Sequence, residues 1–122
     1  MLKVNLDEVK AIAFLEPVGE LSEKNFISAA KIIDPYLKKV GKLNGIIIHV
    51  KSFPAWDSFG ALIGHLKFIE EHHKKVSRVA FVTDSSVGGF VKYVASHFIV
   101  AESKKFAFSE MDKAEKWILE DK

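Results

Sequence analysis

The sequence predicts a single α/β domain in which helices flank one sheet of mostly parallel strands with an N-terminal antiparallel hairpin. Two apolar, β-branched runs, residues 46–50 and 76–83, are continuous rather than alternating, which is typical of strands buried on both faces. Segments with apolar residues at helical spacing separate the strands, and we expect about four helices. The 122 residues, 48% of them hydrophobic, suffice for one compact core. We therefore expect residues 1–122 to form one domain.

The N-terminal part is expected to contain the hairpin and the first helix. Two short strands, near residues 4–6 and 9–15, flank a turn. Ser22 is a suitable N-cap for the helix that follows. Because proline lacks a backbone donor, we expect Pro35 to kink or end this helix near Asp34, with one further turn behind it.

The remaining elements follow from capping residues and apolar patterns. Asp57 is the expected N-cap of a second helix, and a turn at residues 84–86 precedes a third. A last short strand is expected from residues 99–101 and 104–108, with an irregular piece between them, and it leads into a final helix. We expect Ser109 to cap that helix, with Asp112 as its capping-box partner.

Composition narrows the classes of function. The formal net charge is only +2, the lysines are scattered among acids, and Arg78 is the only arginine, so we expect no nucleic-acid binding. No apolar run is long enough to span a bilayer. Without cysteine there is no disulfide or thiolate site, and the first residues lack a signal-peptide pattern. We expect a cytoplasmic protein.

Four features, taken in order, carry a family resemblance. They are the strand Ile46-Ile47-Ile48, the pair Trp56-Asp57, the run Arg78-Val79-Ala80, and Phe108 followed by Ala114 to Leu119. Together they resemble the STAS domain, and more closely the SpoIIAA-like family of small bacterial proteins, which is grouped in fold with the lipid-binding Sec14 (CRAL-TRIO) domains. The resemblance covers essentially the whole chain and implies a fold used for binding, without established chemistry and without a cofactor.

The chain departs from the phosphoregulated STAS domains at one position. Those domains carry an Asp-Ser-Ser-Gly type motif in which the serine before the glycine accepts phosphate. The corresponding residues here are Asp57, Ser58, Phe59 and Gly60. Phenylalanine replaces the acceptor serine, so the resemblance does not imply this phosphorylation switch.

The candidate binding residues gather around the loop after the central strand. His49 is expected at the carboxyl end of that strand, where open α/β sheets bind ligands, but its default interpretation is a partly buried structural histidine. Trp56 either covers the core or contacts a ligand or partner. The candidates for binding a ligand or partner are His49, Phe53, Trp56, Asp57, Ser58 and Arg78.

Catalytic and metal sites are not expected. Ser58 and His65 are seven residues apart on one helix, roughly 10 Å along its axis, so they cannot form a nucleophile–base pair. The adjacent His72 and His73 diverge around a helix, and no H-x-x-x-H spacing occurs. Residues 84–89 resemble a small anion cradle, but we expect an ordinary loop with a cap, because the lysine and spacing of a phosphate-binding loop are missing.

Three hypotheses of function follow. The first is a non-enzymatic binding or regulatory domain that recognises a protein partner, or itself as a homodimer, through residues 53–60 and the second helix. The second is a carrier that holds a small apolar or lipid-like ligand between sheet and helices, as the Sec14 kinship implies. The third is a hydrolytic enzyme that uses His49 and Asp57.

Overall fold

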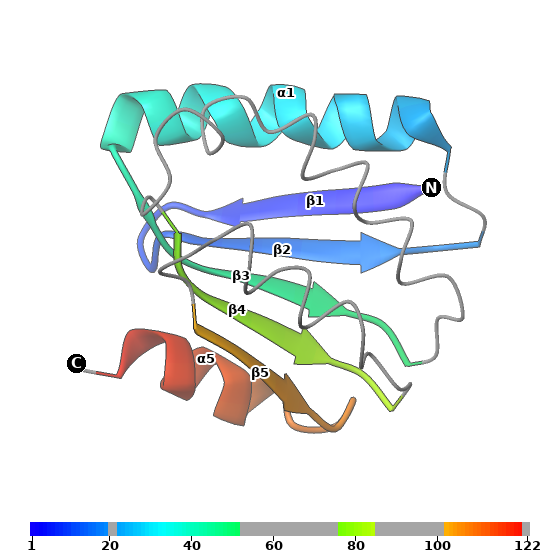
Figure 1. The fold of residues 1–122 in the computed structure, drawn as a ribbon, viewed down its shortest axis with the longest axis vertical. Helices are drawn as coiled ribbons and strands as arrows, with labels where there is room; N and C mark the ends of the chain where they lie inside the picture. The colour runs from blue at the N-terminus through cyan, green and yellow to red at the C-terminus, as the bar shows by residue number, and fades with distance from the viewer. Residues whose placement is uncertain (20–21, 52–75, 85–101, 121–122) are drawn as a thin grey trace.

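The computed structural model describes residues 1–19, 22–51, 76–84 and 102–120, which form a five-stranded sheet with two helices (Figure 1). The strands follow the order β1-β2-β3-β4-β5 across the sheet. β1 pairs antiparallel with β2, and the remaining neighbours pair parallel. The elements are β1 (Leu2–Asp7), β2 (Ile12–Pro17), α1 (Glu23–Val40), β3 (Leu43–His49), β4 (Val76–Val82), β5 (Glu102–Phe106) and α5 (Met111–Leu119).

The predicted α/β class, the N-terminal hairpin and the parallel strands are confirmed. The expected number of four helices is not confirmed, because the described residues contain only α1 and α5. The predicted second and third helices fall within residues 52–75 and 85–101, outside the described ranges.

The hairpin turn is longer than expected. The second strand begins at Ile12 rather than near residue 9, because the Asp7 carboxylate accepts hydrogen bonds from the N–H groups of Val9 and Lys10 at 3.1 and 3.0 Å. These bonds satisfy the backbone locally and keep it out of the sheet. Ala11 closes the turn with a φ of 55°.

The first helix passes through its proline without a break. Ser22 is its N-cap, as predicted, but the expected end near Asp34 is wrong, because α1 is continuous to Val40 with Pro35 inside it. Ile33 and Leu37 lie on either side of Pro35 and are fully buried. Tertiary packing of both halves of the helix therefore outweighs the hydrogen bond that proline removes.

The two helices cover different parts of the sheet. α1 lies along β1, whereas α5 lies against β3, β4 and β5 (Figure 1). Ala114 and Ile118 of α5 are buried and pack against a cluster of apolar side chains from the sheet. The sheet residues of this cluster are Ile12, Ile47, Ala80, Val82 and Phe106.

A glycine allows α5 to approach the sheet closely. A Cβ atom built on Gly45 of β3 would lie 2.6 Å from Cγ2 of Ile118 and 2.7 Å from its Cδ1. Real Cβ atoms do not come this close to other heavy atoms. The Ile118 side chain therefore packs directly on the backbone of β3 at Gly45.

Candidate functional site

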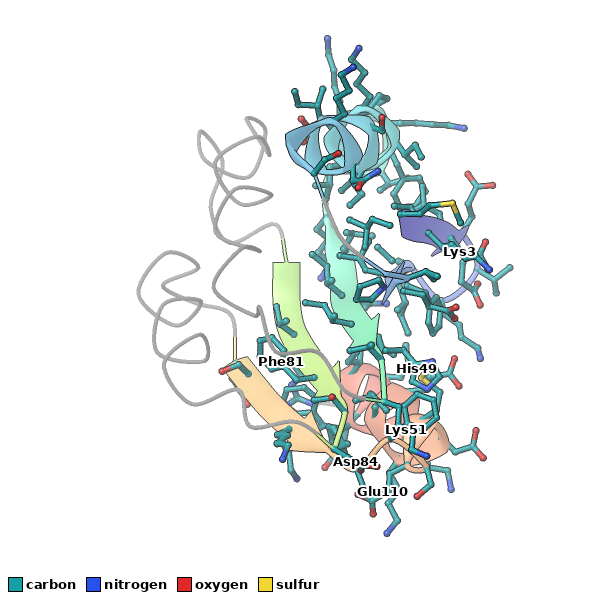
Figure 2. All side chains as sticks on the ribbon, turned by 90° about the vertical axis from the view of Figure 1, so that its right-hand side faces the viewer. Lys3, His49, Lys51, Phe81, Asp84 and Glu110 are labelled. Atoms are coloured by element: carbon teal, nitrogen blue, oxygen red, sulfur yellow. The ribbon has the colours of Figure 1, made fainter. Side chains whose placement is uncertain are left out.

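The candidate site lies at the carboxyl edge of the parallel strands, which faces the viewer in Figure 2. Backbone hydrogen bonds continue past the strand ends and hold this edge together. The N–H of Val50 donates to the Val82 carbonyl at 3.1 Å, and the N–H of Thr83 donates to the Phe106 carbonyl at 2.9 Å. The Lys51 carbonyl accepts from the N–H of Asp84 at 3.0 Å and from the Thr83 hydroxyl at 3.3 Å.

Asp84 joins the end of β4 to the turn before α5. Its carboxylate Oδ1 accepts a hydrogen bond from the backbone N–H of Phe108 at 3.1 Å. Asp84 is exposed and lies beside Lys51 at this edge (Figure 2). The sequence predicted a turn here, and the turn residue also fixes the position of the aromatic residue that follows β5.

His49 is the predicted site residue with the best-defined surroundings. Its ring stacks on that of Phe108, with centroids 4.4 Å apart and planes 6° apart. Its Nδ1 lies 3.8 Å from Oε1 of Glu16 on β2. The side chain keeps 22% of its surface exposed. The imidazole is thus held against an aromatic ring and beside a carboxylate while part of it still faces solvent.

Register explains why Glu16 lies next to His49. β2 and β3 pair in parallel with Leu15 opposite Ile48, so the next pair of positions along the strands is Glu16 and His49. Both side chains point to the face of the sheet that α5 covers further along, because alternate residues of a strand share a face. Neither Glu16 nor Phe108 was predicted as a site residue. These neighbours depend on the register between strands, which cannot be read from the sequence alone.

Glu110 closes this edge at the start of α5. Its Oε1 accepts from the Ala107 N–H at 2.9 Å, and its Oε2 accepts from Nζ of Lys113 at 2.9 Å. The hydrogen bond from Lys113 is the largest cause that lowers the pKa of Glu110, and the hydrogen bond from Ala107 is the second. The hydrogen bond to Glu110 in turn raises the pKa of Lys113. The expected Ser109 cap is wrong, because Glu110 is the N-cap and its longer side chain reaches back to the turn.

The last strand ends earlier than predicted. It spans Glu102–Phe106, whereas its second part was expected at residues 104–108. The expected first part, residues 99–101, lies outside the described residues. Its final residue, Phe106, is buried against α5, whereas Phe108 belongs to the following turn and stacks on His49. The hydrogen bond from Phe108 to Asp84 takes this residue out of the sheet ladder and presents its ring at the edge.

Arg78 lies at the opposite end of the sheet. It pairs with Gly45 while His49 pairs with Val82, a separation of four residues or about 13 Å along the strands. The structure therefore does not bring Arg78 and His49 together.

The contacts of Arg78 are with α5 and β5. Its side chain is 9% exposed, its guanidinium carbon lies 5.0 Å from the centroid of the Trp117 ring, and Nη1 donates to the Trp117 carbonyl. Nε is 3.8 Å from Oε2 of Glu102. A cation beside the last carbonyls of a helix interacts favourably with the helix dipole, so Arg78 holds the C-terminal end of α5 against β4.

The other four predicted site residues, Phe53, Trp56, Asp57 and Ser58, lie outside the described residues. Their proposed roles stay predictions. Within the described ranges, no three side chains of the metal-binding types are grouped so that they could hold an ion. Neither α1 nor α5 is long and apolar enough to cross a membrane.

Comparison of the sequence with known protein families gives a match. The family model described as SpoIIAA-like matches residues 12–119. This range begins at the first residue of β2 and ends at the last residue of α5, so it contains all of the parallel sheet and both helices. No curated protein and no solved structure gives a significant match. The chain belongs to the SpoIIAA-like family, as its central strand and the residues around it predicted.

Proposed function

We propose that this chain is a non-enzymatic binding or regulatory domain that recognises a protein partner, or a second copy of itself, at the carboxyl edge of its sheet. Membership of the SpoIIAA-like family is consistent with such a role. The observation that carries the proposal is the partly exposed His49 ring, stacked on Phe108 and flanked by Glu16.

This ring pair is held in place without any partner. His49 ends a strand that is paired on both sides, and Phe108 is fixed through its N–H to Asp84. A surface whose side chains are already ordered loses little conformational entropy when it is bound. Rings of this kind, with charged groups around them, are typical of the centre and rim of protein interfaces.

Two acids near this edge are engaged in structural contacts. Asp84 accepts the Phe108 N–H, and both oxygens of Glu110 accept hydrogen bonds. Glu16, the acid beside His49, is 48% exposed and belongs to the proposed binding surface. The hydrolytic alternative uses His49 and Asp57, and Asp57 lies outside the described residues.

The predicted partner-binding segment follows this edge closely in the sequence. Lys51 is the last described residue after β3, and residues 53–60 begin two positions later. The candidates Phe53, Trp56, Asp57 and Ser58 lie in this segment, outside the described residues.

The test compares association of the wild type with truncations of this surface. The variants are His49→Ala, Phe108→Ala and Trp56→Ala, with Val9→Ala as control because Val9 is 96% exposed in the hairpin turn. Self-association is measured by sedimentation equilibrium, and other partners by quantitative affinity capture from cells of the source organism, repeated with the purified partner. Circular dichroism confirms that each variant is folded.

We expect the three variants to weaken association by tenfold or more, as removal of an interface aromatic commonly does, while Val9→Ala leaves it unchanged. Equal association of all folded variants would refute the proposal. The carrier alternative has a separate test, in which the purified protein is analysed by native mass spectrometry and by solvent extraction. An apolar molecule found by both methods would favour the carrier.

A further inference from the structure

The outer side of α1 carries a continuous row of lysines. The exposed residues at the three-and-four spacing of one helical face are Lys24, Ser28, Lys31, Ile32, Pro35, Lys38 and Lys39, and we call this set the α1 lysine face. Nitrogen-tipped side chains project from α1 away from the sheet in Figure 2. From the sequence, lysines scattered among acids are expected over the surface, whereas four lysines gather on this face.

The α1 lysine face is directed away from the core. Its residues lie opposite Ile33 and Leu37, which are fully buried. Asp34 borders the face, three residues after Lys31 and four residues before Lys38. The face carries four lysines against this one acid, so its net charge is positive. Such a face is complementary to an anionic partner.

The length of the face defines the shape of that partner. Lys24 and Lys38 are 14 residues apart, about 21 Å along the helix axis. A small anion such as a phosphate reaches one or two of these ammonium groups. An extended anionic surface reaches all four at once, and a straight helix lying on a flat surface provides that geometry.

The side chains between the lysines favour a lipid surface over nucleic acid. Ile32 is 46% exposed and Pro35 is exposed within the face, and both can enter the headgroup region of a bilayer. The face contains no arginine or aromatic residue, the types that recognise bases and phosphates by fork geometry or stacking. Lysine, a point charge on a flexible stem, suits the diffuse charge of anionic headgroups.

We propose that the α1 lysine face docks the protein on the surface of a bilayer that contains anionic lipids. The helix lies in the plane of the surface with its buried side still packed on the sheet. Docking of this kind is peripheral and depends on charge, so salt weakens it. It is independent of the carboxyl-edge surface, because none of its residues belongs to that surface.

The test is flotation with vesicles of phosphatidylcholine alone or with 30% phosphatidylglycerol. The α1 variant is Lys31→Gln/Lys38→Gln/Lys39→Gln. The matched control is Lys3→Gln/Lys105→Gln/Lys116→Gln, which removes the same charge from exposed lysines outside α1. These substitutions replace exposed side chains, and circular dichroism verifies the fold. A third variant, Ile32→Ser, tests the apolar contribution.

We expect the wild type and the control to float with anionic vesicles at low salt and to be released by 0.5 M NaCl. Each lysine contributes roughly fivefold in affinity, so the α1 variant is expected to bind about 100-fold more weakly. Ile32→Ser is expected to bind several-fold more weakly.

Three results would overturn the proposal. The first is a wild type that stays unbound with anionic vesicles. The second is an equal loss in the control, which would reflect net charge alone. The third is preferential binding of duplex DNA or polyglutamate over anionic vesicles that depends on the same three lysines.

Discussion

Gly45 of β3 lies so close beneath Ile118 of α5 that a methyl group at this position would overlap the isoleucine, with Cβ and Cγ2 only 2.6 Å apart. Ile118 is 3% exposed and belongs to the cluster that joins α5 to the sheet. One contact between a glycine and a branched side chain therefore determines how deeply α5 sits.

Gly45→Ala is expected to lower the free energy of unfolding by about 1–3 kcal/mol, because overpacking a filled core forces side chains or backbone to shift. Urea denaturation measures this change. In an Ile118→Ala background the added methyl group has room, so the same substitution is expected to cost much less. An equal cost in both backgrounds would show that the close contact is not the reason.

Arg78→Met is expected to lower the free energy of unfolding by about 2 kcal/mol, because it removes a charged hydrogen bond to the Trp117 carbonyl and the cation beside the Trp117 ring. Urea denaturation measures the loss. Fluorescence in a Trp56→Phe background, where Trp117 is the sole tryptophan, is expected to report a changed environment. Arg78→Lys serves as the matched variant: it keeps the charge and is expected to recover only part of the stability. An Arg78→Met protein as stable as the wild type would contradict the role of Arg78 in holding the C-terminal end of α5 against β4.

The Glu110–Lys113 pair is expected to make stability depend on pH on the acid side. The pKa of Glu110 is lowered in the folded protein, so its contribution is fully present above the pKa of the unfolded chain and is lost as the pH falls through the lower, folded value. Glu110→Gln should therefore destabilise the protein at pH 7, and the difference from wild type should shrink toward pH 3. A double-mutant cycle with Lys113→Met, measured from pH 7 down to the acid limit of folding, isolates the pair. Coupling that stays constant over this whole range would rule this account out.

Asp84→Ala is expected to release the turn that carries Phe108. The lost hydrogen bond to the Phe108 N–H should cost about 0.5–1.5 kcal/mol and increase hydrogen exchange at that amide. Asp112→Ala is the control, because Asp112 is also exposed but lies within the first turn of α5. Unchanged exchange at Phe108 would mean that Asp84 does not hold the ring against His49.

The backbone architecture follows largely from the sequence, because continuous apolar strands and a glycine-terminated amphipathic helix are local patterns. Residues 46–50 and 76–83 correspond closely to β3 and β4, and Ser22 starts α1 as expected. Pro35 was misjudged because its local penalty is outweighed by the burial of Ile33 and Leu37, which is a property of the tertiary fold.

The surroundings of the site could not be read from the sequence for the same reason. His49 was expected at the carboxyl end of its strand, and it lies there. Its neighbours Glu16 and Phe108 come from positions 33 residues before and 59 residues after it, and only strand register and the Asp84 hydrogen bond bring them together. The Lys10–Glu115 ion pair, at 3.3 Å, likewise joins distant segments.

The position of α5 in the chain has a consequence for truncated forms of the protein. All five strands precede Met111–Leu119, so a released chain without this helix leaves Ile47, Ala80, Val82 and Phe106 uncovered by α5 on one side of the sheet. Uncovered apolar surface of this kind promotes aggregation of nascent chains. A cut or a premature stop between β5 and α5 would therefore produce a chain with exposed apolar sheet residues, which chaperones and proteases recognise.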